Sequence, residues 1–184
     1  MTTQAEVLTQ NSSKTFLIAT LQVLGFAALT GIAAHIKIPL GFTPVPITLQ
    51  SLVVVLSGAM LGSKKGALSQ AAMIALGIVG FSVFSQPLSA AAVLTGPTGG
   101  YILGFILTAF VAGAIREKIN SRSFIKNFAL YFIASLFIFV PGVIWLKVLT
   151  GQSWNVSLAL GFWPFLLGDA LKTAMVAGTL SLKK

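Results

Sequence analysis

The chain has 184 residues, of which 56% are hydrophobic and only 8% are charged, with a formal net charge of +9. A soluble domain carries roughly 25% charged residues, so this composition argues against a water-soluble protein and indicates a single-domain integral membrane protein. The basic excess is typical of loops on one side of a membrane. The sequence has no basic stripe interleaved with aromatic residues, the pattern that would indicate nucleic-acid binding. The chain has no cysteine and one histidine, which excludes disulfides, thiolate catalysis and a Cys- or His-rich metal site.

Six apolar segments follow one another along the chain and predict an all-α, six-helix transmembrane bundle. They are residues 15–34, 47–62, 66–85, 98–115, 127–149 and 157–180, after a polar N-terminal tail at residues 1–14. The second segment is short, and its start is expected to be extended or tilted. Pro141 and Pro164 are expected to kink the fifth and sixth helices, because proline removes a backbone donor.

The basic residues divide unequally between the two sides of this bundle. Nine of them fall on the side of the termini: Lys14, Lys64, Lys65, Arg116, Lys118, Arg122, Lys126, Lys183 and Lys184. Only Lys37 and Lys147 fall on the other side, and the twelfth, Lys172, lies inside the sixth segment. Because basic loops stay in the cytoplasm, the sequence predicts that both termini are cytoplasmic and that the chain spans the cytoplasmic (inner) membrane.

The stretch "HIKIPLGFTPVP" at residues 35–46 follows the first segment on the outer side. Its three prolines and one glycine exclude a regular helix. We expect it to lie as a lid over the outer ends of the helices.

Asp169 and Lys172 form an opposite-charge pair inside the sixth segment. Each charge in mid-membrane costs about 2.5 to 3.5 kcal/mol on insertion scales, and residues three apart share one helix face. One interpretation is a salt bridge that locks the bundle. The other is a ligand site or ion path that faces a cavity between helices, since intramembrane ionisable residues are functional by default.

Other polar residues are expected at the same outer half of the bundle. The motifs "PVPITLQ" and "GPTGGY" place Thr48, Gln50 and Tyr101 near the outer ends of the second and fourth helices. Taken singly, Thr48 and Gln50 also suit helix ends, and Tyr101 suits an interfacial anchor.

Small residues recur at helical spacing in two segments. Gly100 and Gly104 form GxxxG in the fourth, and Ala27 and Gly31 form a small-xxx-small pair in the first. Such pairs allow close helix packing, either within the chain or against a partner.

The chain contains none of the motifs that would make it an enzyme. No P-loop occurs, so the chain is not expected to hydrolyse ATP itself. No nucleophile or metalloprotease motif occurs either, and a single mid-membrane aspartate lacks the second acid of an aspartyl protease.

Several motifs together resemble the BioY biotin transporters, over about residues 26 to 172. They are "FAALTGIAA", "IPLGFTPVPITLQSL", "LGSKKGAL", "GIVGFSVF", "GPTGGYILGF" and "PFLLGDALK". The resemblance implies a six-helix substrate-binding subunit, the S component, of an energy-coupling factor transporter that takes up biotin. Biotin would bind near the outer face. The implied partners are a transmembrane coupling protein and two ATP-binding subunits, and ATP is used only by them, so the chain is expected to have no cofactor of its own.

The resemblance also suggests roles for individual residues. Asp169 and Lys172 match the family's GDxxK, so Asp169 would accept from the ureido N–H groups of biotin. Lys172 would donate to the ureido carbonyl, polarise Asp169, or meet the valerate carboxylate. Gln50, Thr48 and Tyr101 lie in the other two motifs and complete the implied pocket.

Two departures from the family pattern concern the substrate carboxylate and the partner surface. The loop 85–97 has no charge where family members often carry an arginine, so Ser85, Gln86, backbone N–H groups or Lys172 are the candidates for the carboxylate. Ala27 and Gly31 are the nearest match to the AxxxA pattern that S components use against the coupling protein.

Two alternatives to biotin uptake remain open at this stage. One is a secondary carrier of a small vitamin-like solute in which Asp169 takes up a proton and Lys172 modulates it. The other is a structural membrane protein with a buried Asp–Lys salt bridge.

Overall fold

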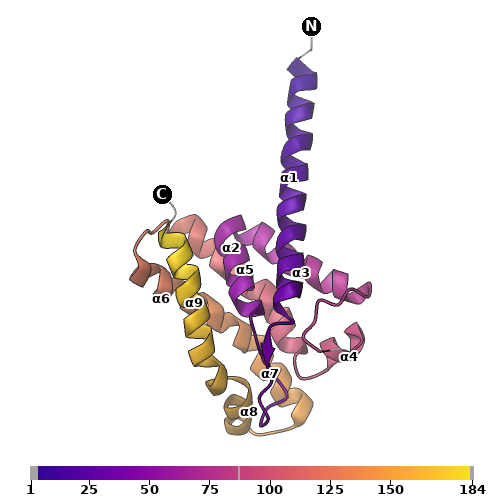
Figure 1. Cartoon of the computed structure of the whole chain (residues 1–184), viewed down its shortest axis with the longest axis vertical. Helices are drawn as coiled ribbons and strands as arrows, with labels where there is room; N and C mark the ends of the chain where they lie inside the picture. The colour runs from indigo at the N-terminus through magenta and orange to yellow at the C-terminus, as the bar shows by residue number, and fades with distance from the viewer. Residues whose placement is uncertain (1–3, 87, 183–184) are drawn as a thin grey trace.

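Helices that run along the long axis of the molecule make up nearly all of the structure, a computed structural model that describes residues 4–86 and 88–182 (Figure 1). A two-stranded sheet is the other regular element in this part of the chain. The elements are α1 (Gln4–Ala33), β1 (Lys37–Ile38), β2 (Ile47–Thr48), α2 (Gln50–Leu61), α3 (Ser63–Ile78), α4 (Ala90–Thr95), α5 (Gly99–Lys118), α6 (Phe124–Ser135), η1 (Leu136–Ile138), α7 (Phe139–Thr150), α8 (Trp154–Gly161), η2 (Trp163–Phe165) and α9 (Leu166–Ser181). The predicted all-α bundle is confirmed.

The bundle presents an apolar surface to its surroundings. Within the part of the chain that the structure describes, three helical runs are long and apolar enough to cross a membrane: Lys14–Ala33, Gly99–Lys118 and Phe124–Thr150. Leu167, Leu171 and Met175, spaced four apart on α9, are 75%, 63% and 61% exposed. Asp169 and Thr173 of the same helix are buried. This helix therefore turns an apolar face outward and a polar face inward, the opposite of a helix on a soluble protein.

The two prolines interrupt the segments in which they lie. Pro141 is the third residue of α7, which follows the 3-10 turn η1 that separates α6 from α7. Pro164 lies in η2, where Phe162 departs from helical geometry with φ −130° and ψ −65°. The predicted kinks are confirmed, and the second is a full break, because α9 starts anew at Leu166.

Several predicted boundaries need correction. Helix α1 begins at Gln4, so residues 4–14 are helical rather than a separate tail, while residues 1–3 lie outside the described residues. Helix α3 ends at Ile78 instead of continuing to residue 85, and Gly80 follows with a φ of +104°, a backbone conformation that glycine adopts readily. The loop 85–97 contains the short helix α4.

The stretch after α1 is non-helical, as predicted, and begins with a β-hairpin strand. Strands β1 and β2 pair antiparallel with Lys37 opposite Thr48 and Ile38 opposite Ile47. The extended start predicted for the second segment is therefore β2. His35 Nε2 lies 2.8 Å from the carbonyl of Ser82, and Thr43 Oγ1 donates to the carbonyl of Leu160 at 2.7 Å. These bonds tie the segment to the loop after α3 on one side and to α8 on the other.

Glycines allow α2, α3 and α5 to approach at backbone contact. A Cβ on Gly58 would lie 2.1 Å from the carbonyl oxygen of Ala109, and one on Gly113 would lie 2.2 Å from the nitrogen of Ser63. Gly100 and Gly104 likewise pack α5 against the Phe139–Thr150 helix and the turn before it. The GxxxG pair thus serves packing within the chain.

Ala27 and Gly31 also pack within the chain. Ala27 is fully buried, and a Cβ on Gly31 would lie 2.7 Å from Cγ1 of Val83 in the loop after α3. In this chain they serve internal packing, and their place on a partner-binding surface stays a prediction.

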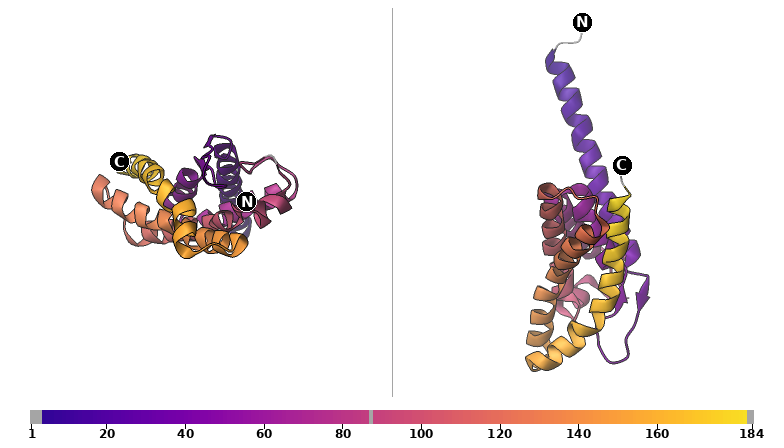
Figure 2. Two further views of the ribbon diagram at one scale, coloured as in Figure 1. Left: turned by 90° about the horizontal axis from the view of Figure 1, so that it is seen from below. Right: turned by 90° about the vertical axis from the view of Figure 1, so that its left-hand side faces the viewer.

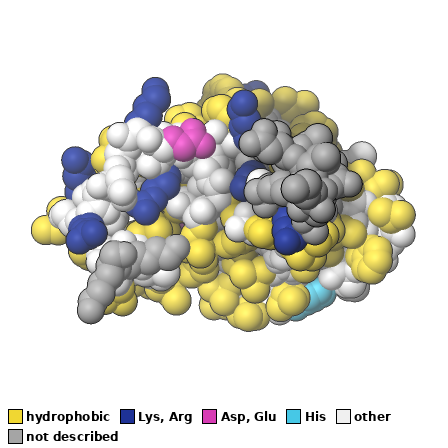
Figure 3. All heavy atoms as spheres, turned by 90° about the horizontal axis from the view of Figure 1, so that it is seen from above, with side chains coloured by type: hydrophobic (Ala, Val, Ile, Leu, Met, Phe, Trp, Pro, Cys, Tyr) yellow, Lys and Arg dark blue, Asp and Glu magenta, His cyan; other side chains and the backbone are white. Residues whose placement is uncertain are grey.

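The N-terminal end of α1 and the C-terminal end of α9 point to the same end of the bundle, beyond which α1 extends (Figures 1 and 2). Lysine and arginine side chains gather on that end (Figure 3). Among the acidic side chains that the structure describes, Glu117 at the end of α5 accepts from Ser63 N and Oγ at 2.7 and 2.9 Å. Glu117 thus caps the start of α3 and belongs to a different part of the structure from Asp169.

The close packing predicts opposite effects for two Gly→Ala variants. Gly113→Ala is expected to lower stability by roughly 1–3 kcal/mol, because the new methyl group meets backbone atoms that cannot move aside. A Cβ on Gly25 of α1 would have no atom within 4 Å. Gly25→Ala is therefore expected to leave stability unchanged or to raise it slightly, since alanine favours helix. Thermal unfolding of the detergent-solubilised variants measures both, and equal melting temperatures would contradict the packing argument.

Candidate functional site

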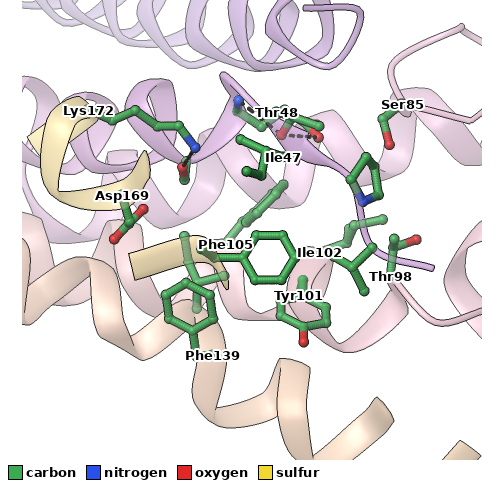
Figure 4. A pocket seen from close by; sticks show the side chains of 16 residues that line it. Ile47, Thr48, Ser85, Thr98, Tyr101, Ile102, Phe105, Phe139, Asp169 and Lys172 are labelled. Carbon is green, nitrogen blue, oxygen red and sulfur yellow. Dashed lines mark hydrogen bonds between the residues drawn. The ribbon is translucent and has the colours of Figure 1, made fainter. Parts of the chain in front are cut away.

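A cavity of about 630 Å³, including its open mouth, lies among β2, α2, α5, α7 and α9 (Figure 4). The residues that line it are Val45, Pro46, Ile47, Thr48, Gln50, Ser51, Ser85, Thr98, Tyr101, Ile102, Phe105, Ile138, Phe139, Phe165, Asp169 and Lys172. Five of the six residues predicted for substrate binding are among them, namely Thr48, Gln50, Tyr101, Asp169 and Lys172.

Asp169 occupies the first turn of α9 and is 3% exposed. The break at η2 creates this helix start inside the bundle, where the positive end of the helix dipole favours a carboxylate. Its Oδ2 atom is buried and has no hydrogen-bond partner. A buried acceptor without a donor is costly, so this oxygen is a strong candidate to bind a ligand N–H group.

Lys172 lies one turn further along α9 and lines the same cavity. Its Nζ donates to Ser51 Oγ of α2 at 3.0 Å. Because Asp169 Oδ2 has no partner, Lys172 does not neutralise it through a direct bond. The two charges are therefore brought together at one side of the cavity without forming the salt bridge of the structural interpretation (Figure 4).

Gln50 is the first residue of α2 and is 4% exposed. Its Nε2 is buried without a partner, whereas its Oε1 accepts from Thr48 Oγ1 at 3.4 Å. Thr48 Oγ1 also accepts from the backbone N–H of Gln50 at 3.3 Å. Thr48 therefore orients the amide of Gln50 and leaves an unpaired N–H donor.

Tyr101 contributes its ring rather than its hydroxyl. The hydroxyl donates to the carbonyl of Gly161 at 2.9 Å, and the ring packs edge-to-face on Phe139 at 6.3 Å. A Cβ on Gly142 would lie 2.4 Å from the Tyr101 ring, and one on Gly161 would lie 2.3 Å from its hydroxyl. These two glycines form the slot that holds the ring at the cavity wall.

The middle of the cavity is apolar. Phe105, Ile102, Tyr101 and Phe139 lie between the charged pair on one side and Ser85 and Thr98 on the other (Figure 4). The site thus combines an end rich in hydrogen-bonding groups with an aromatic and aliphatic wall, which suits a small molecule with a polar head and an apolar body.

Gln86 does not line this cavity. It lines a second cavity of about 420 Å³, which shares Pro46 and Ser85 with the first. The sixth predicted residue is therefore a neighbour of the site and is separated from Asp169 by the length of the first cavity.

Sequence reasoning missed several cavity residues. Ser51 directly follows the "PVPITLQ" motif, so the motif itself pointed to it. Phe105, Phe139 and Phe165 gave no signal of their own, because an aromatic residue that faces a cavity reads the same as one that faces lipid or the core.

Comparison with known proteins gives a consistent result. The model of the BioY family matches residues 3–183. The "Biotin transporter BioY" of Thermotoga maritima is 41% identical over 156 residues, which cover 83% of this chain and 87% of that protein. A "Biotin transporter BioY" of Lactococcus lactis subsp. cremoris is 34% identical over 179 residues, 95% of this chain and 89% of that protein.

A solved structure agrees with these relatives. The crystal structure of the S-component for biotin from an ECF-type ABC transporter matches with a TM-score of 0.82 and 27% identity. The match covers 91% of each chain. Since the family model spans nearly the whole sequence and a known S component shares the fold, this chain is a multi-pass membrane protein that belongs to the BioY family, a family of transporters and not of enzymes.

Proposed function

We propose that the chain binds biotin in the first cavity and acts as the substrate-binding S component of an ECF-type transporter. The names of the relatives and the fold of the matched S component support this assignment. The observation of this chain's own that carries it is the pair of unpaired groups in one apolar cavity, the acceptor Asp169 Oδ2 and the donor Gln50 Nε2.

The head of biotin is a cyclic urea with two N–H donors and one carbonyl acceptor. The carboxylate of Asp169 accepts from a ureido N–H, and such charge-assisted bonds are stronger than neutral ones. The ammonium of Lys172 and the amide of Gln50 donate to the ureido carbonyl. Ser51 keeps Lys172 directed toward this end of the cavity through the 3.0 Å bond between them.

The body of biotin is a sulfur-containing ring with an aliphatic chain. The wall formed by Ile102, Phe105 and Phe139 offers it apolar contact, and sulfur packs favourably against aromatic rings. The aliphatic chain of biotin then extends toward Ser85 and Thr98, away from Asp169 (Figure 4).

The proposal also covers the membrane in which the protein resides, its orientation there and its partner subunits. The chain resides in the cytoplasmic membrane with both termini in the cytoplasm, because basic residues cluster where α2 meets α3 and where α5 meets α6, on the side of the termini. A transmembrane coupling protein and two ATP-binding subunits supply the energy, in keeping with the ECF-type ABC transporter to which the matched S component belongs.

Asp169→Asn is expected to weaken biotin binding roughly 10- to 100-fold, because the amide removes a charge-assisted acceptor. Isothermal titration of the purified protein with biotin measures the loss. Glu117→Gln makes the same acid-to-amide change at the end of α5, outside the cavity, and is expected to leave the affinity unchanged. Unaltered affinity in Asp169→Asn would remove Asp169 from the site.

Accumulation of biotin is expected to require ATP and the partner subunits. Proteoliposomes that contain the chain alone bind biotin without concentrating it, and those with the full module concentrate it when ATP is supplied on the cytoplasmic side. Uptake by the chain alone that follows an imposed pH gradient would instead support the proton-coupled carrier, with Asp169 as the proton-binding group.

The orientation is testable by cysteine labelling, since the chain has no cysteine of its own. Gln152→Cys, in the turn between α7 and α8, is expected to react in intact cells with a membrane-impermeant maleimide. Asn120→Cys, in the loop between α5 and α6, is expected to react only after permeabilisation. The reverse pattern would contradict the proposed topology.

A further inference from the structure

We propose that Lys37, on strand β1, binds the carboxylate of the substrate in the second cavity. This inference rests on the proposed biotin function and adds a residue to it. The loop 85–97 carries no charge, so a cation for the carboxylate has to come from another element.

The second cavity adjoins the first at the end opposite to Asp169. Lys37, Thr43, Ser85 and Gln86 provide its polar groups. Ser85 borders both cavities and lies on the far side of the site from Asp169 and Lys172 (Figure 4). A ligand that fills the first cavity along its length therefore ends beside the second.

The β-hairpin holds Lys37 at this junction. Lys37 pairs with Thr48, a residue of the first cavity, across the two strands. Its Nζ donates to the carbonyl of Ser85. An ammonium has three N–H donors, so this bond fixes the position of the charge and leaves two donors for an anion.

Charge makes Lys37 the suitable cation. Lys172 lies beside the Asp169 carboxylate, which repels a second carboxylate, and both are at the end of the first cavity opposite to Ser85 (Figure 4). Lys147 lies 5.1 Å from the centroid of the Trp154 ring and lines neither cavity. Lys37 thus attracts the acidic tail at one end while Asp169 receives the neutral head at the other, and the two together orient the ligand.

The experiment compares biotin with biotinamide, in which the carboxylate is replaced by a neutral amide. Lys37→Met is expected to weaken biotin binding roughly tenfold and to leave biotinamide binding unchanged. Lys37→Arg keeps the charge and is expected to retain most of the affinity for biotin. Lys147→Met is the matched control on the same side of the membrane and is expected to alter neither ligand.

Each contrary result has a distinct meaning. Equal weakening of both ligands by Lys37→Met would overturn the inference, because Lys37 would then only hold the hairpin to Ser85. Unchanged binding of both ligands would overturn it as well. Wild-type protein that binds neither ligand would contradict the proposed function itself, independently of Lys37.

Discussion

The buried carboxylate of Asp169 is the constraint on which the rest of the site depends. A lone carboxylate in the middle of an apolar bundle is strongly disfavoured. The chain meets this cost by breaking the last segment at Phe162–Phe165, so that Asp169 falls in the first turn of a new helix with its dipole oriented favourably. One oxygen still has no partner, which is a reason to keep the site for a ligand with N–H groups.

The cavity lies where two helices begin inside the bundle. Helix α9 starts after η2, and α2 starts after the extended residues of β2, so the first turns of both face one space. Gln50, Ser51 and Asp169 all belong to those first turns. Irregular backbone at such depth is tolerated where it is covered by protein or lines a cavity. The glycine contacts among α2, α3 and α5 hold α2 in place although it has only 12 residues.

The sequence was sufficient to predict the apolar segments, the kinks and the polar residues Asp169, Lys172, Gln50 and Thr48, because an ionisable or amide group inside a membrane segment is a rare signal. The end of α3 was not predictable from hydropathy. Val79 and Phe81 continue the apolar run, yet they are exposed after the helix ends, whereas Val83 and Phe84 turn back into the core. The small residues Ala27 and Gly31 showed that something packs closely, but spacing alone does not identify the neighbour. From the sequence, Lys37 is only a charge in a loop, because its place beside Ser85 depends on contact between segments far apart in the chain.

In the proposed complex with biotin, the two ends of the site differ in how much binding free energy is lost when the ligand lacks the matching group. We infer that this difference determines how the protein discriminates among ligands. Asp169 and Gln50 are nearly dry, so a ligand without a urea-like head leaves a buried acceptor and a buried donor unpaired and loses a large part of the binding free energy. Lys37 is exposed, and water solvates its ammonium whenever the ligand has no acid. Loss of the ligand's carboxylate therefore costs only the attraction itself. The head should set whether a molecule binds, and the tail should set its direction and the preference for an acid over its amide or ester.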